Sequence, residues 1–590
     1  MRAERGKSAF GFGVWVVVLI AFFFGCAEVE GNDQATPPVL PKIDRRPKSA
    51  DFKRGVLRSL PKHQANSTDP FEVDLRGYDL SELDMTSAAA DLAFSSFDDR
   101  TVWPAADRLP KGFDPNGITE TGKNPGLGVR SLHAQGITGR GVGIAIIDQP
   151  LLVEHREYAD RLRFYEEINV LPWQAAQMHG PAVASIAVGR TVGVAPEADL
   201  YYIGHWPIDL FGAVFGKERA MNFTYGARAI HRMLEVNEQL PEDRKIRVIS
   251  ISIGWSSSQK GYQEIAEAAA EAKAAGMLVI CSSVEAVHGF RFHGLGCDPT
   301  GDRDDFNAYR LASWGQHMYR RQDRLLVPMD VRTTASPTGK DEYVFYGQGG
   351  WSWSIPYIAG VYALAAQVDP NVAPDQFWAL AMKTGRMVQY KGGALGPILD
   401  PVTLIAALKA GVLTDPDTVK AELKKYGPTT ARRTDIPGKM EQLDVNNATH
   451  QDVVALFGPP RSYAWDSETY GPNDLPGRYI MSYSDAFNVF IMRDHVVEVR
   501  FDSVDVGYAF RNAIRIGSTL DDVLKVLGPP TETVAGQKIG WQDGILYRDI
   551  DGVKGQGYYA RADQGVRIFL MNDRVMGLYI TRTDPLPGRN

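Results

Sequence analysis

The sequence has only three cysteines in 590 residues, and its basic residues do not outnumber its acidic ones. Cys26 lies in an apolar N-terminal segment, which leaves Cys281 and Cys297 for the rest of the chain. A single pair is no disulfide framework, so the fold must depend on its hydrophobic core. The formal net charge of −7 gives no reason to expect a nucleic-acid partner, and a hydrophobic content of 44% is typical of globular domains.

The chain is too long for one compact core, and a domain scale of roughly 100 to 200 residues predicts two to four units. Composition and hydrophobic patterning divide it into regions of different kinds. We expect a signal segment at 1–27, a Pro-rich basic linker at 28–65, a prosegment or N-terminal arm at 66–118, a large α/β domain at 119–413, a linker at 414–440 and a tandem α+β repeat domain at 441–590, in halves 441–510 and 511–590.

The N-terminus has the pattern of an export signal. Basic residues precede the apolar run Val14–Phe24, and Gly25-Cys26-Ala27 follows it. The letters FFGC also resemble a loose bacterial lipobox, in which Cys26 would become the lipidated first residue, although two phenylalanines replace its small residues. The alternative is an uncleaved anchor from Ala9 to Ala27, which is just long enough to span a hydrocarbon core of roughly 30 Å. All three interpretations place the protein outside the cytoplasm, either secreted or tethered to a membrane.

The region 119–413 alternates strand-like and helix-like segments. Val142–Ile147 is a continuous apolar run of the kind expected for a strand that is buried on both faces. Similar runs recur as ADLYYIG, RVISISIG and GMLVICSS, separated by GARAIHRMLEVNEQL and YQEIAEAAAEAKAAG. This order predicts an α/β fold with a parallel sheet and helices on both faces. The active or ligand-binding site of such a fold lies at the carboxyl ends of the sheet's strands.

Three residues at element ends could form a nucleophilic site. Asp148 ends a predicted strand, His179 precedes a helix, and Ser352 opens the apolar helix of YGQGGWSWSIPYIAGVYALA. Serine chemistry needs a base near the hydroxyl and a carboxylate that fixes the tautomer of the base. The structural alternative is that Ser352 or Ser354 caps the helix, with Pro356 in its first turn. We assign the capping role to Ser354.

These segments resemble the subtilisin-like serine proteases, the subtilase family. The resemblance rests on IAIIDQ, HGPAVASIAVG and GWSWSIPYIAGVYALA, supported by GITGRGVGIAIID, GVAPEADLYYI, VISISIGW and NVAPDQFWALAMKTG, and it covers roughly Gly126–Leu413. It implies that Ser352 is the nucleophile, His179 the general base and acid, and Asp148 the orienting carboxylate. It also implies that Ser252 and Gly254 bind the substrate backbone.

The sequence departs from the family inside this site. Asp148 is followed by Gln-Pro, and tryptophans flank Ser352. Aligning GMLVICSSVEA with the family's oxyanion strand places Glu285 where the family has asparagine, with Val284 as the alternative if the register slips by one residue. An ionised glutamate would repel an oxyanion, whereas a glutamate that is kept neutral by an apolar setting could donate a hydrogen bond. We therefore propose Glu285 as an acid donor, with the Ser352 N–H as the second donor. Trp255, Trp351 and Trp353 predict either an aromatic-lined cleft or ordinary core packing.

A metal site has weaker support. The segment Cys297–Asn307, CDPTGDRDDFN, clusters carboxylates as calcium loops do, and many subtilases are stabilised by calcium. Its spacing does not follow D-x-D-x-D-G, so a solvated acidic turn is favoured. We predict no metal site and no required cofactor, with calcium as the alternative.

The last 150 residues contain an internal repeat. NATHQDVVALFGPPRSY at Asn447 matches GSTLDDVLKVLGPPTET at Gly517, and FIMRDHVVEVRF matches FLMNDRVMGLYI. Each half is predicted as a short capped helix followed by antiparallel strands. The repeat resembles the small outer-membrane lipoprotein and β-lactamase-inhibitor-protein folds, which implies protein contact, while a stabilising appendage is the alternative.

Taken together, these patterns predict an exported serine endopeptidase that hydrolyses peptide bonds and has a protein-binding C-terminal domain. The alternative is a catalytically weak or inactive subtilase-fold protein that serves as a binding module of the cell envelope.

Overall fold

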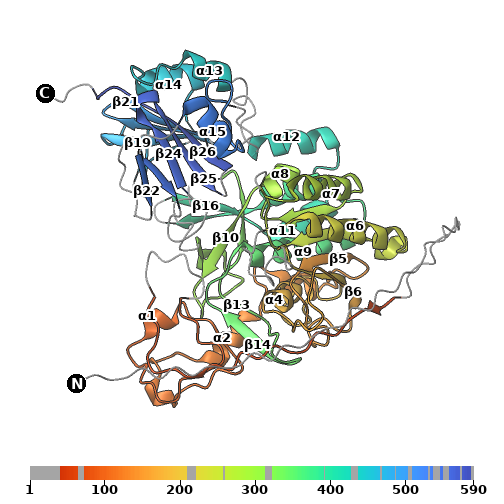
Figure 1. Ribbon diagram of the computed structural model, residues 1–590. Coiled ribbons are helices and arrows are strands. Elements are labelled where there is room, and N and C mark those ends of the chain that lie inside the picture. Colours follow the sequence, from red (N-terminus) through yellow and green to blue (C-terminus); the bar gives the residue numbers. More distant parts are fainter. Residues whose placement is uncertain are drawn as a thin grey trace, which may run out of the picture. The chain divides into compact units, whose positions relative to one another are not determined.

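The computed structural model describes most of the chain (Figure 1). The described residues are 40–63, 72–208, 221–256, 259–311, 322–390, 393–426, 436–460, 462–465, 468–484, 487–501, 508–528, 532–535, 545–548, 557–571 and 574–586.

A parallel sheet forms the centre of the large domain. Its strands follow the order β1-β6-β7-β5-β8-β9, and every neighbouring pair is parallel. The strands are β1 (Lys42–Ile43), β6 (Leu162–Ile168), β7 (Asp199–His205), β5 (Gly143–Asp148), β8 (Ile246–Ile251) and β9 (Leu278–Cys281). The predictions of strands β5, β7, β8 and β9 are therefore confirmed.

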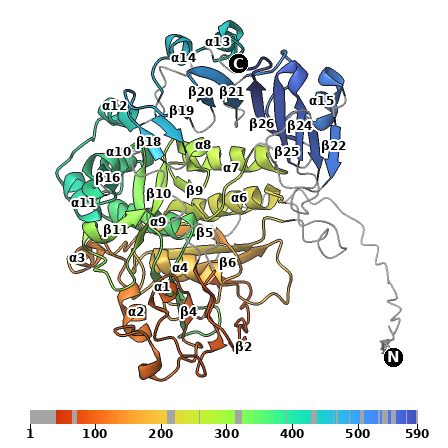
Figure 2. The same cartoon turned by 90° about the vertical axis from the view of Figure 1, so that its left-hand side faces the viewer.

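Helices cover both faces of this sheet, as the continuous apolar strands predict. Along β5, Ile144 and Ile146 belong to one core cluster, whereas Ala145 and Ile147 belong to another. This alternation follows from the period of two in a strand. The first cluster includes α4 (His179–Val188) and α9 (Trp351–Val368), and the second includes α6 (Thr224–Glu238) and α7 (Tyr262–Ala274). Figure 2 shows α6 and α7 above the sheet and α4 below it.

Two smaller sheets complete this domain. A mixed sheet contains β11 (Tyr309–Leu311), β10 (Phe292–Cys297), β12 (Leu325–Pro328), β16 (Gly393–Ile398) and β15 (Arg386–Tyr390), and an antiparallel sheet contains β13 (Arg332–Ala335), β14 (Tyr343–Tyr346) and β4 (Phe97–Asp98). The remaining major helices are α2 (Pro115–Gly122), α3 (Val129–His133), α8 (Val284–His288), α10 (Pro374–Thr384), α11 (Pro401–Lys409), α12 (Pro416–Tyr426) and α13 (Ile436–Gln442).

The N-terminal arm packs on the large domain, as expected. Strand β4 pairs with β14, and the Phe97 ring lies 5.0 Å from Phe345 and 5.1 Å from Trp103, measured between ring centroids. The side chains of Val73, Leu75 and the arm's other buried apolar residues belong to the main core cluster. The arm therefore completes the large domain instead of forming a core of its own.

Parts of the two predicted linkers are structured, although most of their described residues are not buried. Strand β1 adds an edge to the central sheet, and Arg45 pairs with Glu167 at 2.5 Å. In the second linker, 414–440, α12 carries Glu422, which contacts Lys383 of α10 at 3.4 Å. Specific backbone and charge pairing, which composition does not reveal, fixes both segments.

The C-terminal region forms one ten-stranded sheet from two similar halves. Its strand order is β18-β17-β19-β20-β21-β26-β25-β24-β23-β22, and the halves meet where β21 pairs with β26. The strands are β18 (Glu468–Tyr470), β17 (Ser462–Trp465), β19 (Arg478–Ser484), β20 (Phe487–Met492), β21 (His495–Phe501), β26 (Arg574–Thr581), β25 (Val566–Met571), β24 (Gly557–Arg561), β23 (Ile545–Arg548) and β22 (Glu532–Ala535).

The predicted capped helices of the repeat are confirmed. Helix α14 (His450–Phe457) follows Thr449, helix α15 (Leu520–Leu527) follows Thr519, and each threonine forms a capping box with an aspartate three residues later. The threonine hydroxyl and the aspartate carboxylate thereby satisfy backbone N–H groups that the first helical turn leaves free.

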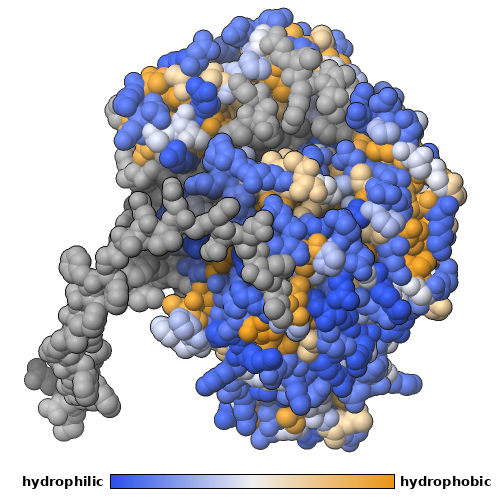
Figure 3. All heavy atoms as spheres, turned by 90° about the vertical axis from the view of Figure 1, so that its right-hand side faces the viewer, coloured by the Kyte–Doolittle hydropathy of each residue, from blue (hydrophilic) through white to orange (hydrophobic). Residues whose placement is uncertain are grey.

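The predicted export segment, 1–27, lies outside the described residues. Within the part of the chain that is described, no helix has the length and apolarity needed to cross a membrane. The face in Figure 3 is mostly hydrophilic, with hydrophobic residues in scattered patches.

Candidate active site

Asp148 and His179 form a hydrogen-bonded pair at the carboxyl edge of the central sheet. Asp148 is the last residue of β5, and His179 is the first residue of α4. The Nδ1 atom of His179 lies 2.7 Å from Oδ1 of Asp148, which also accepts a hydrogen bond from the Gln149 N–H at 2.7 Å. Because Asp148 accepts the Nδ1 proton, the neutral imidazole keeps its lone pair on Nε2.

Gly180 allows the start of α4 to lie close to the end of β5. A Cβ atom at this position would lie 2.4 Å from the Gln149 carbonyl oxygen and 2.7 Å from the Tyr202 hydroxyl. That hydroxyl donates to the same carbonyl at 2.6 Å. The glycine after His179 therefore lets the first turn of α4 pack directly against the end of β5.

The surroundings of His179 favour its protonated form. Burial alone would lower the pKa of His179, but the charge of Asp148 and its hydrogen bond outweigh burial and raise it. A second histidine, His205, ends the neighbouring strand β7 and is fully buried, and burial lowers its pKa to about 4. Among the described residues, a carboxylate lies in hydrogen-bond contact with the His179 imidazole but not with that of His205.

Ser352 lies in the first turn of α9 and is bonded to Ser252, which follows β8. The Ser352 hydroxyl donates to the Ser252 carbonyl oxygen at 3.2 Å, and the Ser252 hydroxyl donates to the Ser352 carbonyl oxygen at 3.1 Å. Within the described residues, no hydrogen bond joins Ser352 to His179.

The capping predictions for this helix are wrong. The N-cap is Gly350, without a side-chain cap. Ser354 is buried inside the helix, and its hydroxyl donates to the Pro328 carbonyl at 3.2 Å. Pro356 lies beyond the first turn and has no N–H to donate to the Ser352 carbonyl four residues before it. The Ser252 hydroxyl supplies the donor that the proline lacks.

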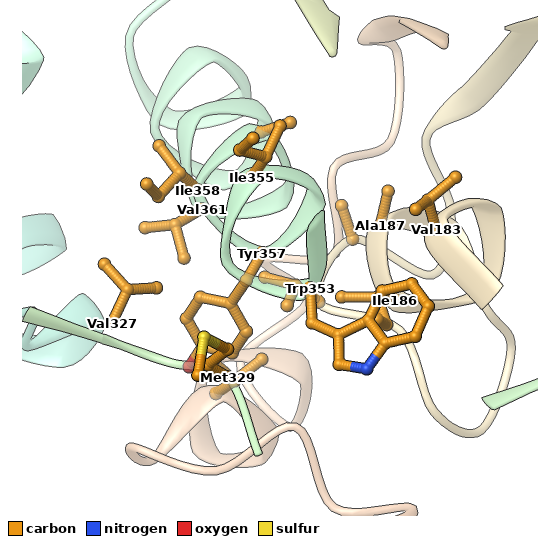
Figure 4. Packing of buried hydrophobic residues seen from close by; sticks show 14 of the residues in the cluster. Val183, Ile186, Ala187, Val327, Met329, Trp353, Ile355, Tyr357, Ile358 and Val361 are labelled. Atoms are coloured by element: carbon orange, nitrogen blue, oxygen red, sulfur yellow. The ribbon is translucent and has the colours of Figure 1, made fainter. Parts of the chain in front are cut away.

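Trp353 connects the start of α9 to the histidine. Its side chain is buried, and its ring centroid lies 5.2 Å from that of His179 and 5.2 Å from that of Tyr346. Figure 4 shows the indole between the first turn of α9 and Ile186 of α4. Trp353 therefore packs in the core beside the imidazole, and it places the residues around Ser352 at the same edge of the sheet as His179.

The other two tryptophans have separate neighbours. Trp255 is buried against Phe223, with ring centroids 6.2 Å apart. Trp351 is half-buried, and its ring lies 5.2 Å from that of Phe292. Core packing accounts for Trp255 and Trp353, whereas Trp351 remains partly accessible.

Glu285 does not have the dry, apolar setting that the acid-donor hypothesis requires. It lies in α8, its side chain is 49% exposed, and its carboxylate accepts from Arg291 Nη2 at 2.5 Å. Val284, the alternative position, is buried and carries no donor in its side chain.

The predicted substrate segment 252–254 is hydrogen-bonded to the residues after β9. The Ser282 N–H donates to the Ile253 carbonyl at 3.1 Å, and the Ser283 hydroxyl bridges the N–H and carbonyl of Trp255, at 2.9 Å each. A Cβ atom on Gly254 would lie 2.8 Å from the Ser283 hydroxyl, so only glycine fits there without rearrangement.

The acidic segment Cys297–Asn307 uses several carboxylates to hold its own turns. Asp298, Asp302 and Asp305 each accept a hydrogen bond from the backbone N–H two residues later. Within the described ranges, no group of three or more histidine, cysteine or acidic side chains is arranged to hold a metal ion. Cys281 and Cys297 are both buried and unpaired.

Asp330 is a residue near the site that the sequence analysis missed. Its carboxylate accepts from the Gly349 N–H at 2.8 Å, in the loop that leads into α9. Burial raises the pKa of Asp330 to about 7, although the Gly349 hydrogen bond and the charge of Arg310 favour ionisation. A lone aspartate after an apolar strand gives no sign of this contact, because it arises between distant segments.

Comparisons with known proteins agree with this geometry. Residues 139–285, which include Asp148 and His179, match the model of the Subtilase family. The subtilisin-like protease PopC of Myxococcus xanthus is 36% identical over 85 residues, which are 12% of this chain and 18% of PopC. The match thus spans less than a fifth of that relative's length.

Solved structures with detectable similarity include the prenylagaramide maturation protease PagA and the self-cleaved protease domain of PatA. PagA is 16% identical with a TM-score of 0.34, over 48% of this chain and 99% of PagA. The PatA domain is 18% identical with a TM-score of 0.33, over 47% of this chain and 100% of that domain. The similarity to the Subtilase family thus covers residues 139–285, the part of the fold that carries Asp148 and His179.

Proposed function

We propose that the protein is a serine endopeptidase in which Ser352 is the nucleophile, His179 the general base and acid, and Asp148 the orienting carboxylate. The observation that carries the proposal is the 2.7 Å contact between His179 Nδ1 and Asp148. This contact fixes the tautomer whose Nε2 can accept a proton, at the edge of the sheet where the first turn of α9 carries Ser352.

The reaction begins with a change in the hydrogen bond of Ser352. The hydroxyl leaves the Ser252 carbonyl, to which it donates at 3.2 Å, and turns to Nε2 of His179. The oxygen then attacks the peptide carbonyl carbon while His179 takes the proton. When the C–N bond breaks, His179 returns that proton to the leaving amine, and an acyl-enzyme remains on Ser352. Water, deprotonated by His179, hydrolyses the ester and restores the serine.

The oxyanion of the tetrahedral intermediate would lie at the N-terminus of α9. The N–H groups of a first helical turn have no intrahelical acceptor, and the helix dipole favours negative charge there. We assign the Ser352 N–H as one donor. Because the Glu285 carboxylate is exposed and bonded to Arg291, Glu285 is not part of the proposed mechanism. Loss of one oxyanion donor typically lowers kcat by roughly 100- to 1000-fold, so we expect a slow enzyme.

Two contacts favour the second candidate, an inactive or weak subtilase-fold protein that binds partners in the cell envelope. The Ser352 hydroxyl is bonded to Ser252 instead of His179, and Glu285, which the sequence alignment assigns as the oxyanion donor, is bonded to Arg291. In this reading the site would be a relic of a protease, and the C-terminal domain would carry the function.

Hydrolysis of unfolded casein by the purified full chain tests the endopeptidase directly. New peptides, identified by mass spectrometry, should appear with the wild type and be absent with Ser352→Ala and with His179→Ala. Equal peptide release from the wild type and Ser352→Ala would reveal a contaminating protease and contradict the proposal. Absence of peptides from the folded wild type would favour the binding module.

We also propose that the protein is exported, on the support of the basic start and the apolar run Val14–Phe24. The predicted lipid attachment at Cys26 rests on the same segment. The serine mechanism itself requires no cofactor.

A further inference from the structure

The C-terminal domain has a cavity to which the proposed protease chemistry gives no role. It has a volume of about 630 Å³ and lies in the first half of the repeat. Its lining, which we call the arginine pocket, consists of Trp465, Tyr470, Pro476, Gly477, Arg478, Met492 and Arg493. A volume of this size is in the range of pockets that bind small ligands or peptide side chains.

The pocket combines stacked aromatic groups with positive charge. The Arg478 guanidinium lies 4.7 Å from the centroid of the Trp465 ring, and Trp465 stacks on Phe490 with a centroid distance of 5.2 Å and an interplanar angle of 9°. Arg478 and Arg493 are both exposed, and within the described residues neither forms an ion pair. The nearby arginines Arg500 and Arg567 differ from them, because both pair with Glu498.

Arg493 occupies an unfavourable backbone conformation. It and Asp494 form the two-residue turn between β20 and β21, with φ angles of 49° and 67°. Glycine, asparagine and aspartate are the residues favoured in such turns, and other side chains are strained there. A strained residue that lines a pocket suggests a role beyond that of the turn itself.

The second half of the repeat provides an internal comparison. In the sequence, Asn572 follows Met571 as Arg493 follows Met492, and asparagine is a residue that such a turn favours. Gln556 follows Gly555 as Arg478 follows Gly477, and Ala535 stands seven residues after Gly528 as Trp465 stands seven after Gly458. The helix caps and the GPP motif are retained in both halves, whereas all three of these pocket residues differ. The architecture of the repeat therefore does not require the arginine pocket.

We propose that the arginine pocket binds an extended acidic peptide segment of another protein. Two unpaired guanidiniums fit side-chain carboxylates, which arginine can bind through two parallel hydrogen bonds. The indole of Trp465 and the thioether side chain of Met492 offer apolar contacts to a neighbouring side chain of the peptide. Strand β18, which contributes Tyr470, stands at the end of the ten-stranded sheet, where an extended peptide can pair with its backbone.

The test uses the full chain with Ser352→Ala, so that the binding result does not depend on whether the protein is a protease. The probe is a fluorescein-labelled peptide of alternating glutamate and leucine, and its affinity is measured by fluorescence anisotropy. Adding Arg478→Glu and Arg493→Glu should weaken binding at least tenfold, which corresponds to about 1.4 kcal/mol. Arg478→Lys, which keeps the charge and loses the planar fork, should give an intermediate affinity.

The matched control is Arg515→Glu with Arg574→Glu, which changes the net charge equally at two exposed arginines in the second half. This control should bind the peptide as the parent does, and a peptide with lysine in place of glutamate should not bind. Equal losses in both double variants would show a general charge effect and overturn the proposal. Unchanged binding in the pocket variant, or absence of binding by the folded parent, would overturn it as well.

Discussion

Ser252 and Ser352 exchange two hydrogen bonds, each from the hydroxyl of one serine to the backbone carbonyl of the other. These two hydrogen bonds join the residue directly after β8 to the first turn of α9. Pro356 explains why a side chain is needed here, because a residue with an N–H would donate to the Ser352 carbonyl within the helix. Ser252 therefore positions the proposed nucleophile as well as lying in the predicted substrate segment.

Ser252→Ala should leave the half-buried first turn of α9 with a carbonyl that lacks a donor, at a cost of about 1–3 kcal/mol in the free energy of unfolding. The same change should lower kcat, because the first turn of α9 loses its attachment. Ser252→Thr keeps the hydroxyl and should restore both quantities. Pro356→Ala should rescue the stability of Ser252→Ala in a double-mutant cycle, measured by urea unfolding, since alanine restores the N–H. Strict additivity of the two changes would show that the proline and the serine are unrelated.

Asp148→Asn should lower kcat by about 10⁴-fold, because the amide cannot hold the imidazole in the required tautomer or stabilise its charge. The pH dependence should change as well. Asp148 raises the pKa of His179, and the base must be neutral, so kcat/KM for the wild type should rise with pH through an apparent pKa above the ordinary value of 6.5. The residual activity of the variant should also rise with pH, but through a lower apparent pKa than that of the wild type. An unshifted pH profile would contradict the electrostatic role of Asp148.

Gly180→Ala should abolish activity, because a Cβ atom cannot fit 2.4 Å from the Gln149 carbonyl and the start of α4 must move away from β5. Gly471→Ala is the control, since no atom lies within 4 Å of the position of its Cβ. Hydrolysis of a peptide substrate and thermal unfolding should both change in the first variant and remain unchanged in the second. Full activity of Gly180→Ala would show that the close approach is not required.

Asp330→Asn should stabilise the protein at alkaline pH. The raised pKa means that the folded state keeps a proton on Asp330 that the unfolded state has lost, so this group lowers stability progressively as pH rises from about 4 to about 7. Asparagine does not titrate, and its side-chain oxygen can still accept from Gly349. The free energy of unfolding of Asp330→Asn, relative to that of the wild type, should therefore increase over that range by about 4 kcal/mol, since the pKa differs by about three units and one unit corresponds to about 1.4 kcal/mol. Urea unfolding at pH 4 and pH 8 measures the difference, and a constant offset between the two proteins would refute it.

The sequence predicted the features that depend on local patterns. Continuous apolar runs located β5, β7, β8 and β9, and the matching segments of the repeat at Asn447 and Gly517 located its two capped helices. Asp148 and His179 could be paired because strand ends and helix starts meet at one edge of a parallel sheet.

The features that the sequence did not predict depend on contacts between distant segments. The Glu285 carboxylate is paired with Arg291 instead of lying in an apolar setting, and the Ser252 hydroxyl supplies the donor that Pro356 lacks. Lys42–Ile43 lie in a basic, proline-rich stretch, yet they pair with β6 and form an edge strand of the central sheet. Composition describes such a stretch as a linker because the partner strand lies more than a hundred residues away.

Fluorophosphonate labelling of the purified full chain, with Ser352→Ala as control, tests the central claim most directly. An activated serine attacks the phosphorus, displaces fluoride and retains the label, which mass spectrometry can locate. We predict a label on Ser352 that grows faster as His179 loses its proton and that is absent in Ser352→Ala. A folded wild-type protein that remains unlabelled across pH 4 to 9 would contradict the assignment of Ser352 as a catalytic nucleophile.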